Sequence, residues 1–196
     1  MVELKAITEE KFIDAFNLKL ASGQEEEYEK RLAQAKSQVN IDALTEVKNK
    51  HAYLEMETKM DRRIAKHRQG PFAVVVFDVN DLKKVNDTAG HQAGDQYLRD
   101  ACKIICNIFK HSPVFRVGGD EFAVIVQGTD YEHIGQRLQK MRDHNAEASR
   151  TGGIVIAYGM ARYENDAYVS DVFERADHRM YVNQGMLKDT GSRMMP

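Results

Sequence analysis

Hydrophobic and polar positions follow different patterns before and after about residue 40. In the charged segment 25–39, four apolar residues recur at intervals of four, three and four, which predicts a helix with a seam of about two heptads. These residues are Tyr28, Leu32, Ala35 and Val39. Such a helix either packs on its own domain or acts as a stalk that pairs two copies of the chain. We therefore expect a helical linker over residues 1–40 and a separate domain over residues 41–196.

The second part of the chain alternates between helical and strand patterns. Residues 72–77 form a continuous, valine-rich apolar run, which is typical of a strand buried on both faces. Asn49 can cap a helix that is ended by Gly70-Pro71. The remaining patterns predict a helix over 95–111, strands over 114–117 and 122–127, a helix capped by Asp130, a strand over 153–161 and a last helix over 170–183, before Gly185. The order strand, helix, strand, strand, helix, strand is the split βαβ plan of an α+β, ferredoxin-like domain.

Composition narrows the function classes. The 196 residues carry 28 Lys and Arg against 30 Asp and Glu, and this balance argues against a nucleic-acid partner. The longest uncharged apolar stretches fall well short of the roughly 20 residues of a membrane helix, so we expect no membrane contact by this segment. Acidic residues near the start interrupt the apolar core that a signal peptide needs. Two cysteines are too few for a fold that is stabilised by disulfides. We therefore expect a cytoplasmic location.

Two carboxylates stand out because of where the chain places them. Asp78 directly follows the buried strand, and Asp120 with Glu121 sits in the tight turn just after Gly118-Gly119. If the strands that carry them are neighbours, the carboxylates converge, and a hard cation such as Mg²⁺ relieves their repulsion. The glycines would let backbone N–H groups approach a phosphate closely. From the turn alone, the alternative is a hairpin that needs glycine for its dihedral angles and exposes its acids for solubility.

The segment from Asp78 to Asp95 favours a ligand site over a purely structural hairpin. Lys83 can present a point charge to phosphate oxygens. Asn86 and Asp95 offer an amide and a carboxylate, a pair that suits a guanine edge, because the carboxylate can accept from N1–H and from the exocyclic amine. Together with the hairpin, these residues indicate a nucleotide site.

Cys102 and Cys106 lie four residues apart on one predicted helix. The pair could hold a soft metal, but no further cysteine or histidine follows at ligand spacing, so we favour two buried small side chains. Near the hairpin, Arg116 can pair with Asp42, and we expect that contact to be structural.

Several motifs together resemble a GGDEF domain of the diguanylate cyclase family. The segment Gly118-Gly119-Asp120-Glu121-Phe122 matches the name-giving motif in full. The segments 42–45, 78–95 and 176–181 resemble the opening Asp-x-Leu-Thr motif, the metal-and-guanine segment and the final helix. The resemblance covers roughly residues 40–188. It implies a nucleotidyl-cyclase, palm-type fold, with a βαββαβ core whose central, mostly antiparallel sheet is flanked by helices.

The resemblance also implies a reaction and a set of site residues. Two subunits, each with one GTP, would form cyclic di-GMP and two pyrophosphates, so a homodimer is needed for catalysis and Mg²⁺, or Mn²⁺ in its place, is the expected cofactor. The implied catalytic residues are Asp120, Glu121 and Lys83; the substrate-binding residues are Asn86, His91, Asp95, Gly118, Gly119 and Lys188; the metal ligands are Asp78, Val79 through its carbonyl, and Asp120. For His91, a bond to the local backbone is at least as good an interpretation as a phosphate contact.

The chain departs from the family pattern at two functional places. Where the last helix usually carries a lysine and, four residues later, an arginine that both hold phosphates, this chain has Gln184 and Lys188. We expect weaker GTP binding, by about 1–3 kcal/mol, because a charge-assisted contact is lost. The usual Arg-x-x-Asp of a product-inhibition site is replaced over residues 109–112, so feedback inhibition through that site is not expected.

Three hypotheses follow. The first is an active diguanylate cyclase fused to an upstream sensor domain in a longer signalling protein. The second is a catalytically weak GTP-binding module that regulates a protein partner, favoured by Gln184 and Asn183. The third is a helical dimerisation scaffold with a vestigial domain, and it is the weakest because so many site residues are present.

Overall fold

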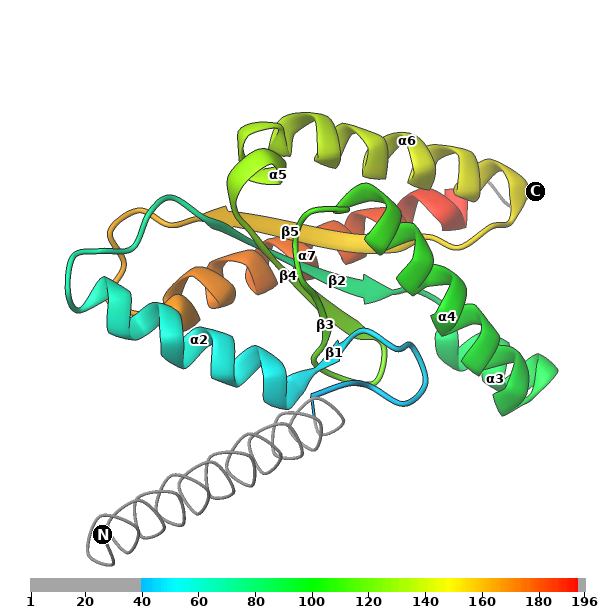
Figure 1. Ribbon diagram of the computed structural model, residues 1–196. Helices are drawn as coiled ribbons and strands as arrows, with labels where there is room; N and C mark the ends of the chain where they lie inside the picture. Colours follow the sequence, from blue (N-terminus) through cyan, green and yellow to red (C-terminus); the bar gives the residue numbers. More distant parts are fainter. Residues whose placement is uncertain (1–39, 194–196) are drawn as a thin grey trace, which may run out of the picture. The chain divides into compact units, whose positions relative to one another are not determined.

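The computed structural model describes residues 40–193. Within this range five strands form one sheet, in the order β1-β3-β4-β2-β5 (Figure 1). The strands are β1 Lys48–Asn49, β2 Ala73–Val79, β3 Val114–Arg116, β4 Glu121–Val126 and β5 Ile156–Arg162. Neighbouring strands are antiparallel except β1 and β3. The α+β fold predicted from the split βαβ order is confirmed, while the predicted heptad seam lies outside the described residues.

Helices cover both faces of this sheet (Figure 1). They are α2 Lys50–Ile64, α3 Leu82–Ala89, α4 His91–Ile108, α5 Gly128–Glu132, α6 Ile134–Thr151 and α7 Val169–Arg193. Alternate side chains of β2 point to opposite faces. Val75 and Phe77 belong to one buried cluster with α4 and α6, whereas Val74 and Val76 belong to the other with α2 and α7. The strand is therefore buried on both faces, as its apolar run predicted.

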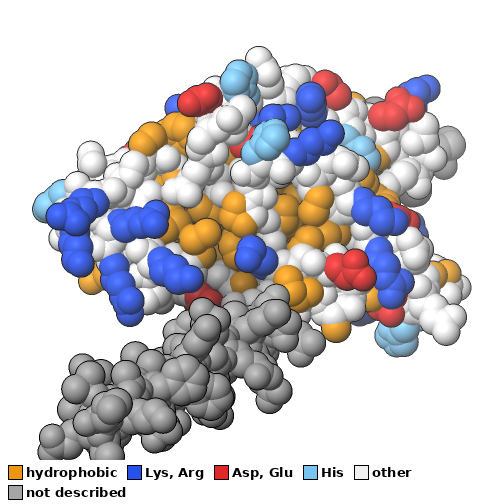
Figure 2. Space-filling model, viewed as in Figure 1, with side chains coloured by type: hydrophobic (Ala, Val, Ile, Leu, Met, Phe, Trp, Pro, Cys, Tyr) orange, Lys and Arg blue, Asp and Glu red, His pale blue; other side chains and the backbone are white. Residues whose placement is uncertain are grey.

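Helix α2 begins where the sequence predicted. The side chain of Asn49 accepts a hydrogen bond from the backbone N–H of Ala52 at 3.1 Å, which satisfies one of the free donors of the first turn. The last turn carries Arg62 and Arg63, whose charge is favourable at a helix C-terminus. Figure 2 shows Lys and Arg side chains gathered over this helix. Within residues 40–193, no helix is both long and apolar enough to span a membrane.

The segment after β2 is more regular than the sequence indicated. Strand β2 continues through Asp78 to Val79, so Asp78 lies within the strand and pairs with β4 and β5 instead of standing beyond its end. A separate helix, α3, then spans residues that sequence analysis left without a regular element. It begins after Asp81, which has a left-handed φ of 63°. Helix α4 follows at Gly90 and starts four residues earlier than predicted.

Other predicted helix boundaries are also wrong. Helix α2 ends at Ile64, before the Gly70-Pro71 that was expected to end it. Asp130 does not cap α6; it is fully buried in the short helix α5, where it pairs with Arg137 at 2.9 Å and accepts from the backbone N–H of His111 at 2.9 Å. It therefore ties three segments together. Gly185 does not end the last helix, because α7 continues to Arg193 and the φ of Gly185 is not left-handed.

Helix α7 crosses β5 at very close range. A Cβ atom placed on Gly159 would lie 2.1 Å from the carbonyl oxygen of Ala176 and 2.2 Å from the backbone nitrogen of Met180. Farther along the helix, Asn183 Oδ1 accepts from the backbone N–H of Tyr158 at 3.0 Å. These contacts fix how far α7 extends along the sheet toward the end of β2.

Candidate active site

The hairpin between β3 and β4 lies beside the end of β2. Asp78 is directly opposite Glu121 in the antiparallel register, and the backbone N–H of Val79 donates to the carbonyl oxygen of Asp120 at 3.0 Å. The two strands are neighbours, so the predicted convergence of the carboxylates is confirmed. A cavity of about 470 Å³ opens here. Its lining residues are Asp78, Val79, Asn80, Asp81, Leu82, Lys83, Lys84, Asp87, Thr88, Asp120 and Gln184.

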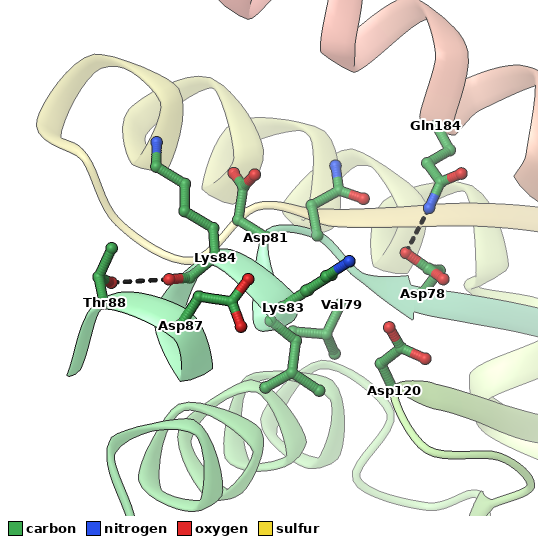
Figure 3. A pocket seen from close by; sticks show the side chains of 11 residues that line it. Asp78, Val79, Asp81, Lys83, Lys84, Asp87, Thr88, Asp120 and Gln184 are labelled. Atoms are coloured by element: carbon green, nitrogen blue, oxygen red, sulfur yellow. Dashed lines mark hydrogen bonds between the residues drawn. The ribbon is translucent and has the colours of Figure 1, made fainter. Parts of the chain in front are cut away.

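Figure 3 shows how the charged side chains lie in this cavity. Asp78 from β2 and Asp120 from the hairpin point into the same space, and the amine of Lys83 extends from α3 toward them. From the opposite side, Gln184 of α7 donates a hydrogen bond from Nε2 to Asp78 Oδ1 at 2.6 Å. Three elements thus deliver carboxylates and a cation to one place, and a fourth contacts one of the carboxylates directly.

The two hairpin glycines have different roles, and neither has a left-handed φ. The interpretation that the hairpin needs glycine for its dihedral angles is therefore wrong. A Cβ on Gly118 would lie 2.4 Å from Glu121 Oε2, so Gly118 makes room for that side chain. A Cβ on Gly119 would meet no atom within 4 Å. The space beside Gly119 is open to a ligand that approaches the backbone.

Arg116 clamps the hairpin from outside the cavity. Its Nε and Nη2 donate to the carbonyl oxygen of Gly119 at 3.1 and 2.7 Å, and its Nη1 donates to Asp42 Oδ1 at 3.1 Å. Asp42 also accepts from the backbone N–H and the hydroxyl of Thr45. Burial opposes the charge of Asp42, but these hydrogen bonds outweigh it and lower the pKa of the carboxyl. The predicted Arg116–Asp42 contact is confirmed.

The acidic residues around the hairpin repel one another. Burial first, and then the charges of Asp120, Asp177 and Asp78, raise the pKa of Glu121. A divalent cation relieves such repulsion, so the donor set suits a hard cation with oxygen ligands. Among residues 40–193, no three His, Cys, Asp or Glu side chains are arranged to hold a metal by themselves. The site therefore fits a cation that completes its shell with backbone, water or substrate phosphate, as Mg²⁺ commonly does.

The structure brings some of the predicted site residues into the cavity and leaves others around it. Asp78, Val79, Lys83 and Asp120 line the cavity, whereas Asn86, His91, Asp95, Gly118, Gly119 and Glu121 do not. Asn86 lies against the start of α4: a Cβ on Gly94 would overlap Asn86 Oδ1 at 1.9 Å. Asp95 is on the first turns of the same helix. The side chain of Lys188 lies outside the described residues.

Sequence reasoning missed several cavity residues. Asp81, Asp87 and Lys84 lie on or next to α3, and their proximity to the carboxylates follows only from that unpredicted helix. The amine of Lys84 points away from Asp78 in Figure 3, unlike that of Lys83. The left-handed φ of Asp81 marks this segment as strained, but only the structure shows it, so no signal in the sequence pointed to these residues.

A family profile described as "Diguanylate cyclase, GGDEF domain" matches residues 39–188 of this chain. The chain belongs to the GGDEF family. This confirms the resemblance inferred from the motifs and places the chain in a nucleotidyl cyclase class of enzymes, which generally use divalent metal ions. The chain is 32% identical to Diguanylate cyclase DgcS of Shewanella oneidensis over 147 residues, which make up 74% of this chain and 49% of that protein.

Two further relatives help to define this GGDEF domain. Cyclic di-GMP phosphodiesterase NbdA of Pseudomonas aeruginosa is 34% identical over 139 residues, which are 68% of this chain and 18% of that protein. The coiled coil and GGDEF domain of DgcB from Caulobacter crescentus, solved in complex with c-di-GMP, superposes with a TM-score of 0.68 at 25% identity. That match covers 86% of this chain and 92% of the other. The chain spans about half or less of the length of the two curated relatives.

Proposed function

We propose that this domain is a diguanylate cyclase that condenses two GTP molecules into cyclic di-GMP and releases two pyrophosphates. The observation that carries the proposal is that Asp78, Asp120 and Lys83, from three different elements, line one cavity beside an open hairpin glycine. Such a site suits phosphoryl transfer, in which catalysis is mostly positioning and charge neutralisation. The 32% identity to a protein named diguanylate cyclase supports the same reaction.

The residues of the cavity take distinct roles in this proposal. Asp78, Asp120 and the Val79 carbonyl would hold Mg²⁺ or Mn²⁺, which supplies Lewis-acid neutralisation of charge on the phosphates. Lys83 offers its ammonium to the same phosphates. Asp120 accepts the proton of the attacking 3′-hydroxyl, and Glu121 adds negative charge that keeps the hairpin selective for cations. The open backbone at Gly119, next to Gly118, gives the triphosphate room to approach.

Guanine recognition is assigned to the junction of α3 and α4. Asn86 and Asp95 present an amide and a carboxylate there, with His91 at the helix start, and a carboxylate favours guanine over adenine because it accepts from N1–H and the exocyclic amine. Lys188, in the last part of α7, is assigned to the phosphates. Each cavity would hold one GTP, so two copies must meet for the reaction. We infer an output domain of a longer cytoplasmic signalling protein, joined through residues 1–40 to a sensor.

Product analysis tests the proposal. The chain at high concentration is incubated with GTP and Mg²⁺, and separately with Mn²⁺, and nucleotides are identified by mass spectrometry. Asp120→Asn is the control, since it removes the charge while keeping the shape. We expect cyclic di-GMP from the parent chain and at least 10²-fold less from the variant, a loss of about 3 kcal/mol or more. Specific activity should rise with protein concentration if two copies are needed.

A second candidate is a GTP-binding regulatory module that acts through a protein partner. Two observations favour it: Gln184 places a neutral amide where the family usually has a lysine, and a relative at 34% identity is named as a phosphodiesterase. GTP binding without any turnover, also at high protein concentration, would support this second candidate and contradict the cyclase.

A further inference from the structure

The departure at Gln184 has a structural consequence that the sequence did not indicate. The side chain neither points away from the site nor supplies a charge; its Nε2 donates to Asp78 Oδ1 at 2.6 Å (Figure 3). Asp78 is half-buried within β2, and it lines the cavity together with Asp120. The amide therefore contacts the carboxylate expected to bind a cation.

The packing of α7 on the sheet fixes the position of the Gln184 amide relative to Asp78. The adjacent Asn183 accepts from the N–H of Tyr158 at 3.0 Å and so ties α7 to the edge strand β5. One turn and more upstream, the helix backbone rests on Gly159, where even a methyl group would not fit. Because α7 cannot slide or lift easily, Gln184 reaches Asp78 from a set position.

We propose that Gln184 is a positioning residue for cation binding: it orients the carboxylate of Asp78 toward the cavity without neutralising it. A lysine at this place would form an ion pair with Asp78 and compete with a divalent cation in the nucleotide-free site. An amide donates the same hydrogen bond but leaves the full negative charge available. The inference rests on the proposed function only in assuming that a divalent cation is used there.

With glutamine in place of lysine at position 184, the site has one positive charge fewer, which favours a metal cation and disfavours the nucleotide. Without a cation at position 184, the triphosphate depends more on Lys83, on Lys188 and on the bound metal. The chain should therefore bind a divalent cation more tightly, and GTP more weakly, than the same chain with a lysine at this position. The two effects have opposite signs, which a purely structural role of the side chain would not produce.

Two variants and one control separate these possibilities. Gln184→Leu removes the hydrogen bond at similar size, and we expect it to weaken Mn²⁺ binding by about 10-fold. Gln184→Lys adds charge beside Asp78, and we expect at least 10-fold weaker Mn²⁺ binding together with at least 3-fold tighter nucleotide binding. Gln136→Lys, an exposed change of the same kind on α6, should alter neither affinity.

The binding of Mn²⁺ is measured by electron paramagnetic resonance of the free ion without nucleotide. Nucleotide binding is measured by calorimetry in saturating Mg²⁺ with α,β-methylene GTP, which cannot release pyrophosphate. Unchanged Mn²⁺ affinity in Gln184→Leu would overturn the inference, and so would a loss of both affinities in Gln184→Lys. Urea unfolding of each variant identifies a folding defect. If Gln184→Leu fails to fold, Gln184→Met, which has similar length but no donor, serves as the second test: it should also weaken Mn²⁺ binding by about 10-fold, and an unchanged affinity would contradict the inference.

The proposed function can fail independently of this inference. If Mn²⁺ and nucleotide affinities shift in opposite directions but no cyclic di-GMP forms, Gln184 positions Asp78 in a binding module and the cyclase proposal is wrong. If cyclic di-GMP forms and the Mn²⁺ affinity of Gln184→Leu equals that of the parent chain, the cyclase stands and the positioning role is wrong.

Discussion

The close packing of α7 on β5 makes Gly159→Ala the most informative single substitution in the fold. The new Cβ would lie 2.1 Å from the Ala176 oxygen and 2.2 Å from the Met180 nitrogen, well inside the 3.0 Å that real Cβ contacts keep. Both neighbours are backbone atoms and cannot rotate away. The helix must therefore recede from the sheet by about 1 Å, which forfeits a quarter to a half of the dispersion energy across that contact.

The expected cost is about 3 kcal/mol of unfolding free energy, at the upper end of overpacking effects, because the backbone rather than a side chain must move. With an m-value of about 2 kcal/mol per molar urea for a domain of this size, the midpoint should fall by about 1.5 M. The same displacement would draw Gln184 away from Asp78, so Mn²⁺ binding should weaken even where the variant is fully folded.

Urea unfolding followed by circular dichroism measures this effect. The matched control is Gly135→Ala on α6, where a Cβ meets nothing within 4 Å. Since alanine is the better helix former, that control should leave stability unchanged or raise it by up to about 1 kcal/mol. A midpoint for Gly159→Ala within 0.3 M of the parent chain, where about 1.5 M is expected, would refute the packing argument.

Three further predictions test other parts of the account. Arg116→Ala, which loses an ion pair and two bonds to a backbone carbonyl, should lower the unfolding free energy by about 2–4 kcal/mol in urea titrations. Glu121→Gln should raise the unfolding free energy by about 0.5 kcal/mol, because Glu121 lies directly opposite the like charge of Asp78. Since the pKa of Glu121 is raised, this gain in stability should be present above that pKa and vanish as the pH falls below it. Added Mg²⁺ should also reduce the gain. Cys106, whose pKa the neighbouring Cys102 lowers to about 7 by a hydrogen bond, should react with iodoacetamide at a rate that rises through pH 7, while peptide mass spectrometry finds buried Cys102 unmodified.

Strong local patterns explain what the sequence could predict. The valine run before Asp78 has the composition of a doubly buried strand, and the structure places it between β4 and β5. Asn49 combines a capping side chain with a helical pattern after it, and it caps α2. Asp120 follows a glycine pair between two short apolar runs, which predicted both the hairpin and the convergence with Asp78. In each case a local rule and the tertiary packing agree.

The predictions that failed depend on tertiary contacts. Asp130 has the residue type of a helix cap, but a buried partner, Arg137, and two donors from the preceding segment determine its place. Gly185 has the residue type of a helix end, yet the packing of α7 on the sheet continues the helix past it. Helix α3 has only eight residues and none of them is buried, so it offers about two turns of pattern, against the eighteen residues of α4.

In the candidate site, too, local patterns were predictable from the sequence and tertiary contacts were not. The identities of Asp78, Lys83 and Asp120 were accessible from the sequence. That Asp78 and Asp120 lie together followed from the predicted strand order, whereas the place of Lys83 depends on the unpredicted helix α3. The orientation of Gln184 was not accessible, because it depends on where a long helix crosses an edge strand more than twenty residues away in sequence. Sequence thus indicates which groups are present, while the packing of α7 determines which carboxylate the amide contacts.

The most direct test of the central claim measures cyclic di-GMP and pyrophosphate in the same reaction with GTP and Mg²⁺. The account predicts two pyrophosphates for each cyclic di-GMP from the parent chain, and at least 10²-fold less of both from Asp120→Asn. Pyrophosphate without cyclic di-GMP, or equal product from both proteins, would contradict the assignment of Asp120 and of the cavity that it shares with Asp78 and Lys83.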